Sequence, residues 1–156
     1  MPGLWFEQFS EGMVIEHPIR RTVTEADNTL FCAMTMNPAA LHLHAEAMKA
    51  SPFGERIVNS LFTLGLMVGI SVHDTTLGTT VANLGFEEVA FPAPLFHGDT
   101  VRVRTTVLAL RESRSRPNEG IVTFLHEAMK QDGTVVARCR RAALMRKRPE
   151  ASRPSP

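Results

Sequence analysis

Three polar side chains surround one bend in the segment TMNPAALHLHAEAMKAS, residues 35–51. Asn37 precedes a proline, and His42 and His44 follow as a His-x-His pair. An imidazole can accept or donate a proton near neutral pH, and an amide can orient a water molecule through hydrogen bonds. The arrangement therefore predicts half of an active site. The alternatives are a helix cap with two incidental histidines, or a metal site.

Metal and nucleophile chemistry fit these residues poorly. A His-x-His pair with an amide lacks the third soft ligand that zinc prefers. The remaining histidines lie in unrelated segments: His17, His73, His97 and His126. The sequence has no G-x-S-x-G, P-loop or GxGxxG motif, and neither cysteine adjoins a plausible base. We expect no bound metal and no separate cofactor.

Local signals predict the elements that must position the bend. Thr24 and Asp27 form an approximate capping box, so they should open a helix that ends before Pro38. A short helix can follow in residues 43–51, after the bend. Period-2 alternation or β-branched runs predict four strands in the C-terminal half, within residues 79–91, 100–113, 120–131 and 134–148.

Residues 59–72, NSLFTLGLMVGISV, are apolar on nearly all sides, which predicts a helix that is buried all round. Gly65 and Gly69 share one face, where they would let a strand or helix approach closely. A membrane helix is the alternative, but the run is shorter than the ~20 residues that span a bilayer. One economical packing wraps a curved antiparallel sheet around this helix, an α+β layout. A single sheet exposes its edge strands and one face, which need to be covered. We therefore expect a dimer.

Composition limits the other classes of function. The 156 residues are 44% hydrophobic and 21% charged, which predicts one globular domain in residues 1–148 and a disordered Pro/Ser-rich tail in 149–156. A net charge of +1 gives no general attraction to nucleic acid or to an anionic membrane. Cys32 and Cys139 lack metal-binding spacing, so we expect reduced thiols in a cytoplasmic protein. The N-terminus lacks the pattern of a signal peptide.

Two stretches, FGERIVNSLFTLGLMVGISV (53–72) and VAFPAPLFHGDTVRVRTTVLALRESRSRP (89–117), resemble the MaoC-like hydratases. These are the (R)-specific enoyl-CoA hydratase group of the hotdog fold. The resemblance covers residues 5–147 and includes the pattern F-x-x-P-x-x-x-G-D-T between Phe91 and Thr100. It implies a single hotdog domain, in which an antiparallel sheet wraps around a long buried helix.

The resemblance also implies roles for the residues of the bend. In the family this turn reads D-x-N-P-x-H, with the Asp and the His flanking the water that is added. The catalytic histidine corresponds to His42, and the Asp position corresponds to Asn37. An amide cannot take a proton from water, so His42 would serve as both base and acid while Asn37 orients the water. His44 stands where relatives often carry Asp, and it is interpreted as a surface or helix-start residue.

The start of the 59–72 helix is the expected oxyanion site. Its first turn carries unpaired backbone N–H groups and the positive end of the helix dipole, which suit a developing enolate oxygen. By resemblance, the N–H groups of Ser60 and Leu61 are the candidates. The alternative is that Asn59 or Ser60 simply caps the helix, and the two interpretations can coexist.

Arginines near one hairpin turn could hold the phosphates of coenzyme A. Arg114 and Arg116 are the candidates, because a guanidinium binds phosphate in bidentate fashion. The alternative is that arginines on an exposed strand or turn only solvate the surface and protect sheet edges. Interleaved surface aromatics are missing, so these arginines do not predict a nucleic-acid site.

The function expected from the sequence is that of a hydro-lyase adding water reversibly to an α,β-unsaturated acyl-CoA. The finer expectation, from resemblance alone, is a branched C5 dicarboxylyl-CoA such as mesaconyl- or itaconyl-CoA. Coenzyme A is then part of the substrate rather than a cofactor. Two alternatives stay open: a hotdog thioesterase that would use Asn59, and a non-catalytic subunit that pairs with an active partner.

Overall fold

The computed structural model describes residues 3–149. The tail expected to be disordered therefore lies outside the described residues, except for Pro149. In chain order the elements are η1 (Phe6–Gln8), β1 (Val14–Glu16), β2 (Arg21–Thr22), α1 (Glu25–Met34), α2 (Ala40–Leu43), α3 (Ala45–Met48), α4 (Ser60–Thr75), β3 (Thr80–Ala90), β4 (Thr100–Glu112), β5 (Glu119–Met129) and β6 (Val135–Arg146).

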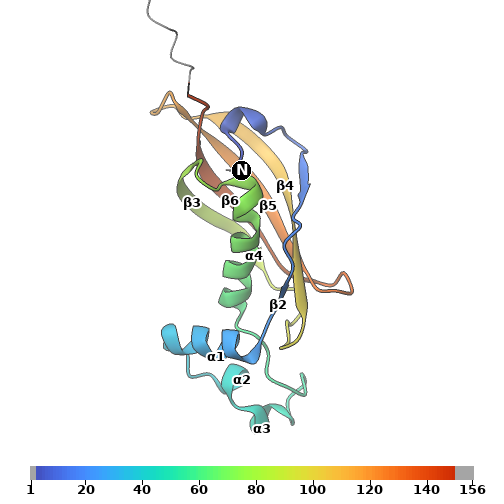
Figure 1. Cartoon of the computed structure of the whole chain (residues 1–156). Helices are drawn as coiled ribbons and strands as arrows, with labels where there is room; N and C mark the ends of the chain where they lie inside the picture. The colour runs from blue at the N-terminus through green and yellow to red at the C-terminus, as the bar shows by residue number, and fades with distance from the viewer. Residues whose placement is uncertain (1–2, 150–156) are drawn as a thin grey trace, which may run out of the picture.

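The strands form one antiparallel sheet in the order β1-β4-β5-β6-β3, and β2 pairs with the start of β4. Side chains of a strand alternate between the two faces of the sheet. In β4 the alternate residues from Val101 to Val107 are therefore fully buried on the face toward α4. Figure 1 shows the curved sheet lying along one side of this helix. The predicted α+β hotdog layout is confirmed.

The long helix α4 packs its inner side against β4, β5 and β6. Thr63, Met67 and Ile70 lie on that side and are almost fully buried. The expectation of burial on every side is wrong for the single chain, because the sheet covers only one side of the helix. Leu61 is 60% exposed, and a Cβ added at Gly65 or Gly69 would meet nothing within 4 Å. Within residues 3–149, no helix combines the length and apolarity needed to cross a membrane.

Three shorter helices gather at the N-terminal end of α4 (Figure 1). The predicted capping box is confirmed: Thr24 accepts from the Asp27 N–H, and the Asp27 carboxylate accepts from the Thr24 N–H. The short helix expected in residues 43–51 is present as α3, and the further helix α2, in the bend before it, was not predicted. His44 separates them, because its backbone leaves the helical region and its Nδ1 accepts from the Ala47 N–H at 3.0 Å. His44 is thus an exposed helix-start residue, as expected.

A chain of hydrogen bonds fastens the C-terminal half of α4 to the sheet. His17 Nδ1 lies 2.9 Å from Asp74 Oδ2 on α4, and His17 Nε2 lies 2.8 Å from Thr105 Oγ1 on β4. The same hydroxyl lies 2.8 Å from His126 Nδ1 on β5. Burial, together with the nearby Arg141 and His17, lowers the pKa of His126 to about 3, so this ring stays neutral. Two histidines that looked unrelated in the sequence therefore belong to one buried network.

Candidate functional site

One ring nitrogen of His42 is fixed by a hydrogen bond, and the other is available to a substrate or water. It lies on α2 and is 8% exposed, and its Nδ1 is 2.9 Å from the carbonyl oxygen of Ile57. A carbonyl can only accept, so Nδ1 carries the hydrogen and Nε2 carries the lone pair. Within residues 3–149, His42 Nε2 has no hydrogen-bond partner. The ring is therefore arranged to accept a proton at Nε2.

Asn37 lies in the same turn and takes part in forming it. Its Oδ1 accepts from the Ala39 N–H at 3.0 Å, while the Ala39 carbonyl accepts from the His42 N–H at 3.0 Å. One residue, Ala39, thus links the two predicted residues through its N–H and its carbonyl group. In the described part of the chain, no hydrogen bond joins the side chains of Asn37 and His42 directly. Oδ1 keeps a second lone pair and Nδ2 has no partner within residues 3–149, so the Asn37 amide can still bind a water.

The start of α4 provides one of the two predicted backbone donors. The side chain of Asn59 caps the helix, and its Oδ1 accepts from the Leu61 N–H at 3.0 Å. The Leu61 N–H is therefore already occupied by the cap. The Ser60 N–H makes no hydrogen bond within the described residues, so it is the donor that remains for a ligand.

Asn28 joins the histidine turn to the helix start. This α1 residue is fully buried, and its Nδ2 lies 3.2 Å from the Ile57 carbonyl oxygen and 3.3 Å from the His42 carbonyl oxygen. Its Oδ1 accepts from the Asn59 N–H at 2.9 Å. The sequence analysis missed this residue. The available signal was an amide four residues before Cys32, on the inward face of a helix whose interior disfavours Asn.

His97 also reaches this cluster, although the sequence placed it in an unrelated segment. Its Nε2 lies 3.1 Å from Asn28 Nδ2, because Ile57 forms an antiparallel bridge with Phe96. Burial and the neighbouring Arg56 guanidinium lower the pKa of His97, which keeps its ring neutral and able to accept from the amide. In residues 3–149, no three His, Cys, Asp or Glu side chains gather as they would around a metal ion.

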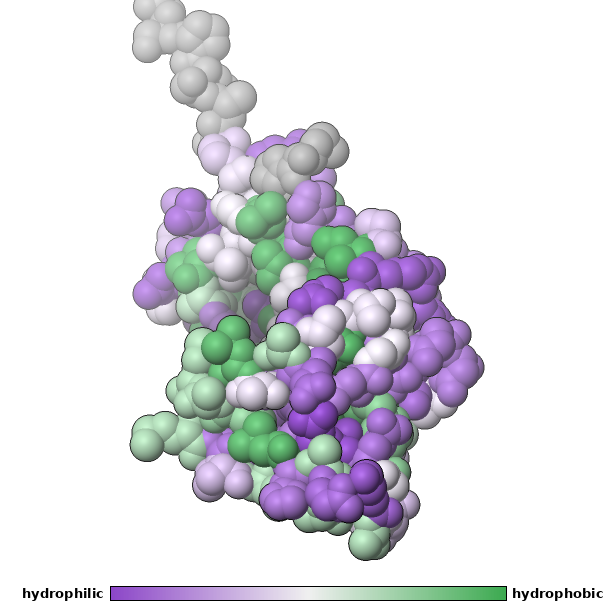
Figure 2. Space-filling model, turned by 60° about the horizontal axis from the view of Figure 1, so that its bottom comes forward, coloured by the Kyte–Doolittle hydropathy of each residue, from purple (hydrophilic) through white to green (hydrophobic). Residues whose placement is uncertain are grey.

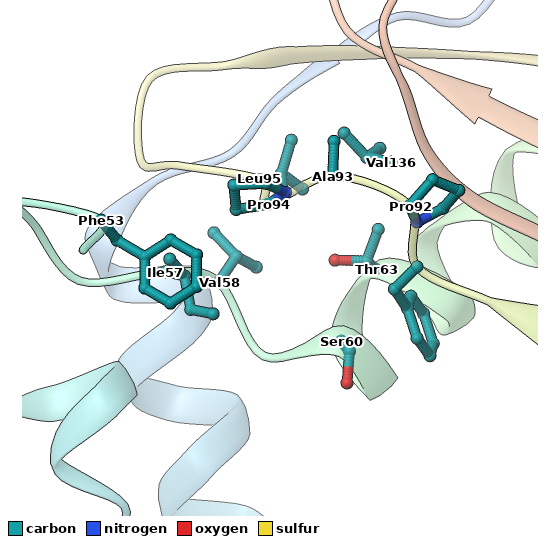
Figure 3. Close-up of a pocket in the computed structure, with 11 residues that line it drawn as sticks. Phe53, Ile57, Val58, Ser60, Thr63, Pro92, Ala93, Pro94, Leu95 and Val136 are labelled. Atoms are coloured by element: carbon teal, nitrogen blue, oxygen red, sulfur yellow. The ribbon is translucent and has the colours of Figure 1, made fainter. Parts of the chain in front are cut away.

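A cavity of about 320 Å³ opens beside the first turn of α4 (Figure 3). Ser60 and Thr63 contribute hydroxyl groups from the helix, while Phe53, Ile57 and Val136 are among its apolar walls. Ile57 borders the cavity with its side chain and binds His42 with its carbonyl group. The space therefore lies next to both the carbonyl group that binds His42 and the start of α4.

The F-x-x-P-x-x-x-G-D-T pattern builds another wall of this cavity. Pro94 lines it, and Gly98 turns the chain with a φ of 92°, a left-handed conformation that favours glycine. Asp99 is 9% exposed and accepts from the Phe96 N–H at 2.9 Å and from Gln131 Nε2 at 2.8 Å. The polar residues of the pattern thus fix the shape of the loop that carries the wall.

Arg114 and Arg116 are not brought to this site within one chain. They occupy the turn between β4 and β5, whereas the loop before β4 carries the cavity wall. β4 has 13 residues, and at ~3.3 Å per residue it separates its two ends by roughly 40 Å. Figure 1 shows this turn at the opposite end of the sheet from α1, α2 and α3. Both side chains are exposed, and Arg116 pairs with Glu119 at 3.3 Å. Arg114 and Arg116 of one chain could therefore contact coenzyme A only at the cavity of another chain.

A family model for the MaoC like domain matches residues 7–129. The chain belongs to this family. Mesaconyl-CoA hydratase of Cereibacter sphaeroides is 33% identical over 154 residues, which are 99% of this chain and 44% of that relative. The MaoC-like chain thus spans less than half the length of this curated relative.

Solved structures agree with the fold. The MaoC-like dehydratase from Rhodospirillum rubrum superposes with a TM-score of 0.85 and 30% identity, covering 95% of this chain and 100% of that chain. A Mycobacterium tuberculosis protein with a double hotdog fold gives a TM-score of 0.86 over 97% of this chain and 46% of that chain. Its identity of 20% supports the fold alone.

Proposed function

We propose that this MaoC-like chain is a hydro-lyase that adds water reversibly to an α,β-unsaturated acyl-CoA. The observation that carries the proposal is the hydrogen bond from His42 Nδ1 to the Ile57 carbonyl, which leaves Nε2 as the proton acceptor. Coenzyme A enters as part of the substrate, with no separate cofactor. The cytoplasmic setting expected from the sequence is part of the same proposal.

The proposed reaction uses one imidazole for both proton transfers. A water held by the Asn37 amide loses a proton to His42 Nε2 as its oxygen bonds to the β-carbon of the enoyl thioester. The electron pair of the double bond moves to the thioester oxygen, and the Ser60 N–H stabilises the resulting enolate. His42 Nε2–H then returns the proton to the α-carbon, so hydroxyl and hydrogen add to the same face.

The finer proposal is a short, branched acyl group of the C5 dicarboxylyl type, such as mesaconyl or itaconyl. The name of the Cereibacter relative supports this choice, and the cavity volume suits a small group. The cavity offers the Ser60 hydroxyl to a carboxylate, whereas the Thr63 hydroxyl already donates to the Asn59 carbonyl at 3.3 Å. No Lys or Arg side chain lines the cavity in the described part of the chain. Mesaconyl-CoA should therefore be compared with an uncharged branched enoyl-CoA of equal length.

One assay separates the proposed function from its alternatives. Purified protein is incubated with crotonyl-CoA and with branched enoyl-CoAs, and both enoyl absorbance and free thiol are followed. Hydration without thiol release supports the hydro-lyase, thiol release indicates a thioesterase, and neither indicates a non-catalytic subunit. The structure gives the thioesterase little support, since Asn59 uses Oδ1 on Leu61 and directs Nδ2 to Cys32 Sγ at 3.7 Å.

The proposed assembly is a homodimer formed through the edge strand β3. This 11-residue strand borders the sheet, and exposed apolar side chains run along it and just past its end: Val81, Leu84, Phe86, Val89 and Phe91. A long apolar edge invites pairing with another strand. A second copy would join the two sheets at β3 and bring another helix toward the open side of α4, where Gly65 and Gly69 leave room.

A second exposed apolar area lies at the end of the molecule formed by α1. Leu30, Met34 and Met36 are 60%, 69% and 88% exposed, and Leu61 of α4 is 60% exposed. Figure 2, which brings this end forward, shows hydrophobic surface interrupting the hydrophilic one. Because α1 packs against the start of α4 through Asn28 and Phe31, the area supports an assembly in which sites lie close to the neighbouring chain.

A further inference from the structure

We infer that Asn28 is a positioning residue that sets where His42 Nε2 lies relative to the Ser60 N–H. The inference rests on the proposed function, and it concerns a side chain that touches neither water nor substrate in that reaction. Its basis is geometric. One buried amide makes hydrogen bonds to both segments that carry the acid–base group and the oxyanion donor.

On one side, Asn28 contacts the turn that carries His42. The Ile57 carbonyl accepts from His42 Nδ1 at 2.9 Å and from Asn28 Nδ2 at 3.2 Å. A carbonyl oxygen has two lone pairs, so the amide occupies the second and fixes the direction of the first. Asn28 Nδ2 also lies 3.3 Å from the His42 carbonyl. Asn28 therefore holds both the backbone of His42 and the Ile57 carbonyl group, which selects the tautomer of the His42 ring.

On the other side, Asn28 contacts the start of α4. Asn28 Oδ1 accepts from the Asn59 N–H at 2.9 Å, and Asn59 in turn caps α4 through the Leu61 N–H. Ser60 lies between Asn59 and Leu61 in the chain, so the cap that joins these two residues fixes the position of the free Ser60 N–H. Displacing a reacting group by about 1 Å can lower the rate 10²-fold. A link between the histidine turn and the start of α4 therefore matters for catalysis.

The chemistry of the position requires an amide. The two hydrogens of Nδ2 are shared among three acceptors, two carbonyl oxygens and the Nε2 of His97 at 3.1 Å, while Oδ1 faces an N–H donor. The reversed orientation would place oxygen against oxygen and donor against donor. A carboxylate at residue 28 would repel the Ile57 and His42 carbonyls, and a leucine would leave four polar groups, all buried or half-buried, without this partner.

The inference is tested with Asn28→Asp, Asn28→Ser and, as the matched control, Thr29→Ala, an exposed neighbour on the same helix. Thermal unfolding gives the folded fraction of each variant. For the folded protein we expect Asn28→Asp to lower kcat by about 10²-fold with KM changed less than about threefold, because positioning rather than binding is lost. Thr29→Ala should match the unmodified protein.

A second measurement reads the tautomer without any substrate. Nitrogen-15 NMR of the imidazoles, with His42 assigned by its disappearance in His42→Gln, should show hydrogen on Nδ1 in the unmodified protein. Asn28→Asp and Asn28→Ser should show a mixture of tautomers. The inference is overturned by hydrogen on Nε2 in the unmodified protein, or by Asn28 variants that keep both the tautomer and kcat. Failure to hydrate any enoyl-CoA would remove the proposed function but leave the tautomer result decisive for Asn28.

Discussion

The Nδ1 of His42 lies 2.9 Å from the carbonyl oxygen of Ile57, a residue that also lines the cavity at the start of α4. The proton-accepting nitrogen is therefore fixed by the same segment that shapes the proposed acyl site. This relationship makes His42 the residue whose loss should be most damaging to catalysis.

His42→Ala should reduce kcat for enoyl-CoA hydration by roughly 10²–10⁴-fold, the usual contribution of a positioned acid–base group. No carboxylate in residues 35–44 can replace it. His44→Ala is the control, since His44 only caps α3 and should leave the rate unchanged. Retention of more than about a tenth of the rate by His42→Ala would contradict the assignment.

Asn37→Ala should cost less than His42→Ala and act mainly on kcat, because orientation of water is lost while the base remains. Asn37→Asp supplies a carboxylate and should keep or raise activity toward simple enoyl-CoAs. Its negative charge stabilises protonated His42, so the acid limb of the pH–rate profile should move to higher pH. An unchanged acid limb, measured from kcat/KM against pH, would place residue 37 away from the imidazole.

Ser60→Pro tests the backbone donor directly. Ser60 is the first residue of α4, a position that tolerates proline, and Asn59 already has the extended ψ of 127° that precedes proline well. Removing the N–H should lower kcat by about 10²–10³-fold, as for other oxyanion donors, with little change in the thermal unfolding midpoint. Ser60→Ala keeps the N–H and serves as the control when crotonyl-CoA is the substrate, because its acyl group has no carboxylate for the Ser60 hydroxyl to bind. Equal rates for the two variants would show that the Ser60 N–H is not the donor.

The buried His126 should make the fold sensitive to acid. Its pKa is about 3 in the folded protein, against an ordinary value of about 6.5 when unfolded, chiefly because burial disfavours its charged form. The unfolded chain therefore binds a proton that the folded chain does not. The free energy of unfolding should fall by up to ~1.4 kcal/mol per pH unit as the pH drops from about 6.5 toward 3.

Denaturant titrations of His126→Gln across the same pH range provide the check, with the exposed His73→Gln as the control. The His126 variant should show the shallower dependence of unfolding free energy on pH, and the His73 variant should follow the unmodified protein. Parallel curves for all three proteins would mean that another group carries the acid sensitivity.

Phe86→Glu should dissociate the proposed dimer. Phe86 is 39% exposed on β3, and a charge there would oppose pairing of the apolar edge. Val14→Glu is the matched control, because Val14 is 55% exposed on β1 at the other edge of the sheet. Light scattering should give twice the chain mass for the unmodified protein and for Val14→Glu, and one chain mass for Phe86→Glu. A strictly monomeric unmodified protein would refute the pairing.

Local signals predicted the fold well. The Thr24–Asp27 capping box and the alternation from Val101 to Val107 depend on residues close in sequence, and both appear in the structure as expected. The full burial assigned to the 59–72 helix failed for a different reason. Apolar composition indicates that a helix side must be covered, but it does not say whether the cover comes from the same chain.

The site was only partly predictable. Resemblance located His42 and Asn37, which share one turn, but nothing in the sequence linked Asn28 to Asn59 or to His97. Those contacts join residues that lie 31 and 69 positions apart and exist only once the chain is folded. Arg114 was chosen because its residue type suits phosphate, but the sequence does not say that its turn lies at the far end of β4 from the cavity.

The open side of α4 has a consequence for how this protein becomes stable. Leu61, Gly65 and Gly69 remain uncovered after the chain has folded. In the proposed homodimer, part of the hydrophobic free energy would therefore be gained only on association. Folding and assembly are then coupled equilibria, linked by mass action. In that dimer the open side of α4 would be covered by the pair, whereas the core between α4 and the sheet is already buried within each chain.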